Sequence, residues 1–186
     1  MTVIIGYVDP SNSEMYMACD TLICSSDYTQ SYLKSKIQKF EGHNVLIGYA
    51  GNLAPIQYIR NKITIDEPYK EGMDLFEYVV RTFAEPMMDL LDGYLRDGDS
   101  FGALIALEGR IFEVDERGLV EESLEPFRCM GSGDKVAYGS LYTTKYMGYT
   151  VEEKLNRALE VTEKVIFNVG HPFIIERIKY KAEDNE

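Results

Sequence analysis

Residues 2–20 read TVIIGYVDPSNSEMYMACD, and this stretch predicts two consecutive strands joined by a turn. Its first part, residues 2–8, is a short apolar run rich in the β-branched side chains that favour extended backbone. Residues 10–13, Pro-Ser-Asn-Ser, are typical of a turn. In residues 14–20 a period of two separates two faces, one of which carries Met15, Met17 and Cys19.

The strand pattern continues beyond this stretch until the spacing of the apolar side chains changes. Residues 36–40 predict a partly exposed strand, and residues 45–50 predict a buried one because they are almost wholly apolar. From residue 53 to 63 the apolar side chains recur every three or four positions. This spacing predicts an amphipathic helix, with Asn52 as its N-cap.

Further strands and helices fill the rest of the chain. Apolar spacing of three and four over residues 73–90 predicts a longer helix, which Pro86 should kink. Thr150 and Glu153 form a capping-box pattern at the start of a last helix. The other elements that we expect are strands at residues 101–107, 110–114, 126–130 and 173–180, and a helix at 134–146.

Strands and helices occur in separate runs and do not alternate. This order favours an antiparallel α+β fold over a parallel βαβ fold. Two antiparallel sheets with a helix pair on each outer face would use every apolar stripe, so we expect a four-layer αββα sandwich. No linker-like, repetitive or low-complexity stretch interrupts the sequence, and we expect one domain over residues 1–186.

The composition excludes several classes of protein. With 45% hydrophobic and 27% charged residues, the chain is neither mostly disordered nor a coiled coil. Its net charge of −12 disfavours nucleic acid as a partner. No apolar run approaches the ~20 residues of a membrane span, and the start lacks the features of a signal peptide. We therefore expect no membrane partner and a cytoplasmic location.

The cysteines and histidines do not form a metal-binding pattern. Cys19, Cys24 and Cys129 cannot all pair within one chain, and we expect them to be reduced thiols. His43 and His171 lie far apart in the sequence, and no C-x-x-C motif occurs. The sequence therefore predicts no metal and no cofactor.

Five short motifs follow one another along the chain in a characteristic order. They are Thr2 at the head of a strand, ACD at 18–20, KI at 36–37, GYAG at 48–51 before a helix, and GSG at 131–133 before another. Together with ALEVTEKVIFNVGHPFIIERI at 158–178, this series resembles the N-terminal-nucleophile (Ntn) hydrolases of the proteasome β-subunit class. It is most similar to HslV, a bacterial proteasome-like peptidase. The resemblance spans about residues 2–180 and implies the four-layer fold of that class.

The resemblance implies that Thr2 is the nucleophile and that its own α-amine is the base. The amine is free only after removal of Met1, which an aminopeptidase could perform. An α-amine has a pKa of about 7.7–8, which suits a general base. Lys36 would lower the pKa of the hydroxyl, and Asp20 would be its partner. Without the resemblance, Thr2 is a β-branched residue at the start of a strand, Lys36 is a solvated strand lysine, and Asp20 is an aspartate in a turn or at a strand end.

Two glycine-containing segments complete the implied site. Gly51 would donate its backbone N–H to the oxyanion of the tetrahedral intermediate, although it is otherwise a turn glycine. Ser132 would help to relay the proton of the α-amine, or would cap the following helix. The chain departs from the class at Leu22 and Cys24, where arginine and threonine are common. It departs again at Ile166 and Val169, before Gly170, where an Asp-x-x-Ser-Gly pattern is usual.

The function implied is that of a threonine-type peptidase that cuts unfolded polypeptides inside a homo-oligomer of stacked rings. Because no Walker motif occurs, a separate ATPase unfoldase would be needed unless the substrates are already unfolded. Two alternatives remain open at this point. The chain could be an inactive ring or assembly component that keeps the fold but has lost, or never matures, the nucleophile. It could also be a small-molecule amidohydrolase with the same fold.

Overall fold

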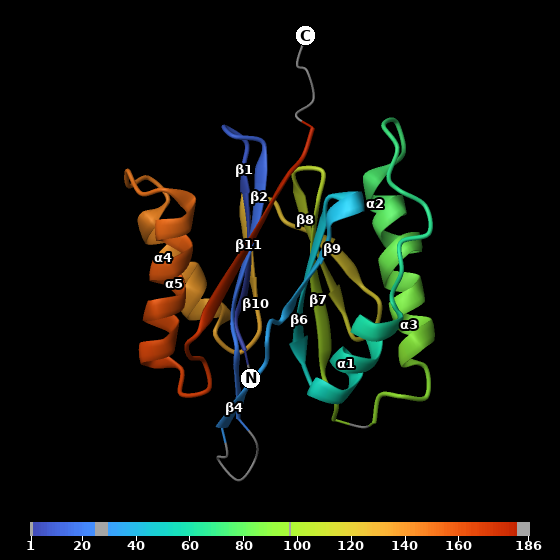
Figure 1. The fold of residues 1–186 in the computed structure, drawn as a ribbon, viewed down its shortest axis with the longest axis horizontal. Coiled ribbons are helices and arrows are strands. Elements are labelled where there is room, and N and C mark those ends of the chain that lie inside the picture. The colour runs from blue at the N-terminus through green and yellow to red at the C-terminus, as the bar shows by residue number, and fades with distance from the viewer. Residues whose placement is uncertain (1, 25–29, 97, 182–186) are drawn as a thin grey trace.

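The computed structural model describes residues 2–24, 30–96 and 98–181, which form stacked layers of sheet and helix (Figure 1). Within these ranges a four-stranded antiparallel sheet has the order β10-β1-β2-β11. The two strands of the opening sequence form its central hairpin, with Ile4 opposite Cys19. The strands of this first sheet are β1 (Ile4–Asp9), β2 (Glu14–Asp20), β10 (Phe127–Met130) and β11 (Phe173–Lys179).

A second antiparallel sheet packs face to face with the first (Figure 1). In the described chain it has five strands in the order β5-β6-β7-β8-β9. Its strand β6 is buried at every residue except the last, as its apolar sequence predicts. The strands of this second sheet are β5 (Ile37–Phe40), β6 (Val45–Gly51), β7 (Phe101–Leu107), β8 (Arg110–Asp115) and β9 (Val120–Glu122).

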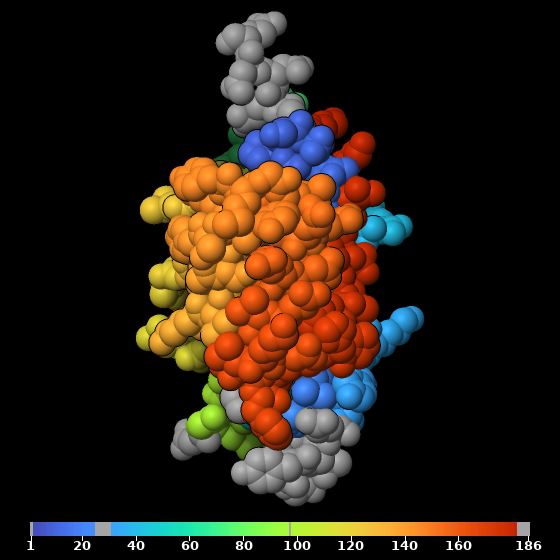
Figure 2. All heavy atoms as spheres, turned by 90° about the vertical axis from the view of Figure 1, so that its left-hand side faces the viewer, coloured from blue at the N-terminus to red at the C-terminus, as the bar shows by residue number. Residues whose placement is uncertain are grey.

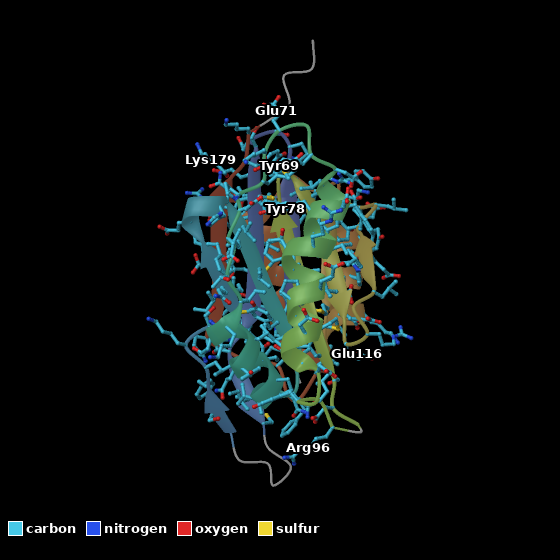
Figure 3. All side chains as sticks on the ribbon, turned by 90° about the vertical axis from the view of Figure 1, so that its right-hand side faces the viewer. Tyr69, Glu71, Tyr78, Arg96, Glu116 and Lys179 are labelled. Carbon is cyan, nitrogen blue, oxygen red and sulfur yellow. The ribbon has the colours of Figure 1, made fainter. Side chains whose placement is uncertain are left out.

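Helices cover the outer face of each sheet. The first sheet is covered by α4 (Asp134–Thr144) and α5 (Val151–Val165), and the capping box predicted at Thr150 and Glu153 is present. Figure 3 shows the opposite face, where the ring of Tyr78 packs edge-on against Tyr69. The elements on this side are α1 (Leu53–Lys62), α2 (Leu75–Val79), the π-helical turn η2 (Val80–Ala84) and α3 (Glu85–Leu91).

The four-layer αββα sandwich expected from the sequence is confirmed, and the alternation along β2 explains how its core forms. Met15, Met17 and Cys19 lie in the core between the sheets, whereas Tyr16 and Ala18 pack toward α4 and α5. Both faces of β2 are buried because one sheet lies on one side and the helices lie on the other. Each large apolar side chain buried in this way contributes about 1.5–3 kcal/mol.

The two sheets approach each other closely at Gly48 of β6. A Cβ added at this position would clash with Ile4 and would lie 2.8 Å from the sulfur of Met17. Gly48 pairs with Ile37 at the start of β5, next to Lys36. This close approach of the two sheets allows the side chain of Lys36 to reach the first sheet.

A hairpin that the sequence did not predict follows β2. Its strands are β3 (Leu22–Cys24) and β4 (Gln30–Tyr32), and residues 25–29 lie outside the described part of the chain. This stretch consists mainly of small and polar residues without a clear period of two, so nothing in its sequence indicated a strand. Strand β9 was also not predicted.

The helix predicted at residues 73–90 is interrupted by the π-helical turn η2 before Pro86. A π-helical turn adds a residue to the turn and therefore rotates the buried face. As a result, Leu75 and Val79 are buried, whereas Phe76, which the simple spacing assigns to the apolar face, is 42% exposed. Met73, which the spacing also assigns to that face, precedes the N-cap Asp74, so it lies outside the helix, and it is 42% exposed. In the described residues, no helix is long and apolar enough to cross a membrane.

Candidate active site

Thr2 lies at the end of the sandwich where β1 begins and β2 ends. Antiparallel pairing of these strands sets the start of β1 beside Asp20, the last residue of β2. Asp20 Oδ1 accepts a hydrogen bond from Thr2 Oγ1 at 2.7 Å and another from the backbone N–H of Val3 at 3.0 Å. Thr2 is only 5% exposed. The carboxylate therefore fixes both the hydroxyl and the adjacent backbone.

Lys36 reaches this carboxylate from the second sheet. Its Nζ donates to Asp20 Oδ1 at 2.8 Å and to the carbonyl oxygen of Leu22 at 2.9 Å. Lys36 is buried, whereas the neighbouring Lys34 and Lys39 are exposed. Burial lowers the pKa of Lys36 below the usual 10.5, and the negative charge of Asp20 opposes that shift. The lysine thus belongs to a buried ion pair and not to a solvated strand face.

Asp20 is the centre of this group. It is fully buried, and within the described residues its Oδ1 accepts all three of the hydrogen bonds from Thr2, Val3 and Lys36. Its Oδ2 is buried and has no hydrogen-bond partner among the described residues. A carboxylate in such a place is tolerated only when it is paired, because an isolated buried charge is very costly.

The loop between β10 and α4 closes over the backbone of Thr2. The Thr2 N–H donates to Ser132 Oγ at 3.2 Å, and the hydroxyl of Ser132 and the N–H of Gly133 donate to the Thr2 carbonyl oxygen at 3.3 and 3.2 Å. Gly131 has a positive φ of 101°, and a Cβ there would clash with the same carbonyl. Glycine at this position therefore allows the loop to approach Thr2. The side chain of Ser132 makes no cap hydrogen bond, because Gly133 is the N-cap of α4.

Gly51 lies at the end of β6, outside the hydrogen-bonded group around Thr2 in the described structure. The N–H of Tyr49 donates to the Lys36 carbonyl at 3.1 Å, and that of Asn52 donates to the Ser100 carbonyl on the other side at 2.8 Å. Because N–H groups alternate along a strand, the Gly51 N–H faces the same edge as that of Tyr49, the edge beside Lys36. The structure thus brings Thr2, Asp20, Lys36 and Ser132 together and leaves Gly51 at an adjacent strand end.

Two positions where the chain departs from the proteasome class lie next to each other. Leu22 and Val169 line the same surface pocket of about 530 Å³, and both side chains are almost fully buried. A Cβ added to Gly170 would lie 3.1 Å from the Leu22 side chain. Apolar packing therefore holds the loop around Val169 and Gly170 against Leu22 of β3. At these places the class commonly has an arginine in the strand and an aspartate and a serine in the loop. Thr21 adds a hydrogen bond to the carbonyl of Pro172 at 2.8 Å.

Chemically, the group presents a hydroxyl beside a buried carboxylate and a buried ammonium. Burial raises the pKa of the Cys19 thiol to about 11, and it also raises that of Cys129, so neither thiol is a competing nucleophile near neutral pH. In the described residues, no group of three or more His, Cys, Asp or Glu side chains could hold a metal ion. Of the two hydroxyls in this group, that of Thr2 bonds to the Asp20 carboxylate and that of Ser132 bonds to the Thr2 carbonyl.

Sequence reasoning missed two contributors to this region. The carbonyl of Leu22 accepts a hydrogen bond from Lys36, but a backbone oxygen leaves no signal in the sequence. Asn52 was predicted only as an N-cap. It does lie at the N-cap position of α1, but its side chain makes no capping hydrogen bond. It bonds instead to the loop at residues 99 and 100.

No protein-family model and no curated protein matches this chain by sequence. Solved structures match it closely in fold. BPH of Thiobacillus denitrificans superposes with a TM-score of 0.79 at 20% identity, over 98% of this chain and 100% of that one. The same protein in complex with epoxomicin gives a TM-score of 0.75 at 20% identity, over 97% and 100% of the two chains.

Two further structures extend the comparison. Eukaryotic HslV from Trypanosoma brucei matches with a TM-score of 0.70 at 15% identity, over 96% of this chain and 100% of that one. Anbu, an ancestral beta-subunit from Yersinia bercovieri, matches with a TM-score of 0.74 at 16% identity, over 96% and 82%. The chain therefore has the proteasome-type Ntn fold, as the sequence motifs indicated.

Proposed function

We propose that this protein is a threonine-type peptidase in which Thr2, freed by removal of Met1, is the nucleophile. One observation carries the proposal. Thr2 Oγ1 and Lys36 Nζ both donate hydrogen bonds to the same buried oxygen, Oδ1 of Asp20. The backbone nitrogen of Thr2 donates to the hydroxyl oxygen of Ser132. Structural roles alone do not require a lysine next to the second sheet to be buried against a carboxylate at the end of β2 in the first sheet.

The proposed reaction has two halves. The α-amine of Thr2 takes the proton of Oγ1, and Oγ1 bonds to the carbonyl carbon of the substrate. The resulting oxyanion accepts a hydrogen bond from the Gly51 N–H. When the intermediate collapses, the carbon–nitrogen bond breaks, and the leaving nitrogen takes the proton from the α-ammonium. Water then attacks the acyl ester with the amine as base, and the proton returns to Oγ1 as the ester bond breaks.

Lys36 and Asp20 act on the nucleophile without changing covalently. The positive charge of Lys36 favours the developing negative charge on Oγ1 and so lowers the pKa of the hydroxyl. Asp20 holds the ammonium and the hydroxyl on one oxygen. Ser132, which contacts the Thr2 nitrogen, would keep the amine oriented during proton transfer.

The substrate class is tested by comparing substrates. We expect hydrolysis of a fluorescently labelled, chemically unfolded polypeptide without ATP, and slower or no hydrolysis of the same polypeptide when folded. A panel of small non-peptide amides provides the comparison. Turnover of the small amides alone would replace the peptidase proposal with an amidohydrolase. Absence of turnover in both assays would favour an inactive assembly component.

Activity should depend on pH in a bell-shaped manner. It should rise as the α-amine loses its proton, at about pH 7.7–8. It should fall again as Lys36 becomes neutral, and because burial lowers the pKa of this lysine, the fall should begin below the usual 10.5. The rate of peptide hydrolysis measured between pH 6 and 11 checks this. A rate that stays constant to the alkaline end would contradict the role of the Lys36 charge.

We also expect a large homo-oligomer built of stacked rings. Figure 2 shows the side of the molecule covered by α4 and α5. Several large apolar side chains of these helices and of the loop between them are exposed, among them Tyr146 of the loop at 89% and Val165 at the end of α5 at 62%. Closed rings bury such surfaces. Light scattering at micromolar concentration should give a mass many times the 21.2 kDa of one chain. A clean monomer would remove the enclosed chamber from the proposal. Tyr146→Asp should weaken assembly if this face is an interface.

A further inference from the structure

Asn52 connects the end of β6 to the loop that precedes β7. Its side-chain Nδ2 donates to Asp99 Oδ1 at 2.9 Å, and its Oδ1 accepts from the Ser100 N–H at 2.9 Å and from the Ser100 hydroxyl at 3.2 Å. Its backbone N–H also donates to the Ser100 carbonyl at 2.8 Å. Asn52 is therefore bonded to Ser100 through both its backbone and its side chain.

The side chain of Asn52 does not act as an N-cap, although the residue lies at the N-cap position. Asparagine at such a position usually accepts a hydrogen bond from the first turn of its helix, but that bond is absent at α1. The amide instead bonds to residues 47 and 48 positions away in the chain. An Asn side chain used in this way holds the 99–100 loop and not the helix.

Ser100, the residue held by Asn52, lies directly against Gly51. The Ser100 carbonyl occupies the space into which a Cβ on Gly51 would project, and Gly51 has a φ of 125°. A shift of Ser100 would therefore change the path of the chain at Gly51. Asp99, the other partner of Asn52, is itself held by the Arg96 N–H on its Oδ2 at 3.0 Å. Figure 3 shows Arg96 at the same end of the molecule as α1.

We propose that Asn52 is a positioning residue that fixes the Gly51 N–H toward the Lys36 edge, where the oxyanion forms. It acts through Ser100 and does not contact the substrate. This inference rests on the proposed function, and it names a residue outside the five that the sequence motifs single out. Because Asn52 is exposed to solvent, its hydrogen bonds compete with water. Its removal should therefore affect the geometry of the donor more than the stability of the fold.

A reciprocal exchange of the two side chains tests this. In Asn52→Asp, the acceptor for Ser100 remains, but two carboxylates then face each other and repel, so kcat should fall roughly tenfold to a hundredfold with little change in KM. Asp99→Asn alone keeps one oxygen, which can accept from Asn52 or from the Arg96 N–H but not from both, so kcat should fall, but less than in Asn52→Asp. In the double variant, the amide of residue 99 donates to the carboxylate of residue 52, and kcat should be restored.

Asn61→Ala is the matched control. Asn61 is an exposed asparagine on the same helix, and its amide donates to the Gln57 carbonyl of its own helix at 2.7 Å. This variant should keep the wild-type kcat and melting temperature. A wild-type kcat in Asn52→Asp, or a loss that the double variant does not restore, would overturn the positioning role. If the wild-type protein itself shows no turnover that depends on Thr2, the proposed function and this inference both fail. The two outcomes described before it would overturn only the role of Asn52.

Discussion

Thr2→Ala is expected to abolish peptide hydrolysis, with a loss of about 10⁴-fold or more, because no other group in the site can form the acyl ester. Thr2→Ser should keep a measurable fraction of the rate, because a hydroxyl remains beside Asp20. The alanine variant should still fold, since Asp20 Oδ1 keeps its hydrogen bonds from Val3 and Lys36. The lost hydroxyl contact should cost about 1 kcal/mol of stability.

A second buried threonine controls for effects on stability. Thr144 is 2% exposed, and its hydroxyl bonds to carbonyls of its own helix, α4. Thr144→Ala should lower the melting temperature slightly and leave the rate per folded molecule unchanged. Hydrolysis and thermal melting measured on all three variants separate chemistry from folding. Wild-type hydrolysis in Thr2→Ala would exclude Thr2 as the nucleophile.

Lys36→Ala should lower turnover by about 10²–10³-fold, because the charge that stabilises the developing alkoxide is lost. It should also lower stability by about 3–5 kcal/mol, since Asp20 would remain buried without its counter-ion. Lys36→Arg keeps the charge but should not rescue the rate, because the larger planar guanidinium does not fit the place of an ammonium. Steady-state kinetics and denaturant unfolding of each variant give both quantities.

Lys39 provides the matched control for this prediction. It lies in β5, three residues after Lys36, but its side chain is 30% exposed and pairs with the exposed Glu41 at 3.4 Å. Lys39→Ala should therefore change neither turnover nor stability appreciably. If Lys36→Ala unfolds more easily but hydrolyses peptides normally per folded molecule, the ion pair is structural and the proposed role of Lys36 is wrong.

Much of the fold could be predicted because its signals are local. The period of two along β2 assigns each side chain to the correct face, and the capping box at Thr150 marks the start of α5. The β3–β4 hairpin has no such pattern in its sequence, since its pairing depends on contacts with the rest of the fold. The π-helical turn at Val80–Ala84 likewise changed which side chains of its helix are buried.

The site could be predicted only by resemblance. Lys34, Lys36 and Lys39 look alike in the sequence, and only the packing of the two sheets at Gly48 explains why Lys36 alone of these three is buried against Asp20. The side chain of Asn52 could not have been assigned, because its partners lie 47 and 48 positions further along the chain. A local pattern can identify a cap position, but it cannot show which distant loop the side chain binds.

The most direct test of the central claim is covalent labelling of the intact protein with epoxomicin, read by mass spectrometry. An epoxyketone has two electrophilic groups, a ketone that reacts with a hydroxyl and an epoxide that reacts with an amine. It therefore reacts at both groups only with an N-terminal residue that carries a hydroxyl beside its free α-amine, as Thr2 would after removal of Met1. We expect a chain that lacks Met1, carries one adduct located on Thr2, and no longer hydrolyses peptides. Peptide hydrolysis by a chain that retains Met1 and takes up no epoxomicin would contradict Thr2 as the nucleophile.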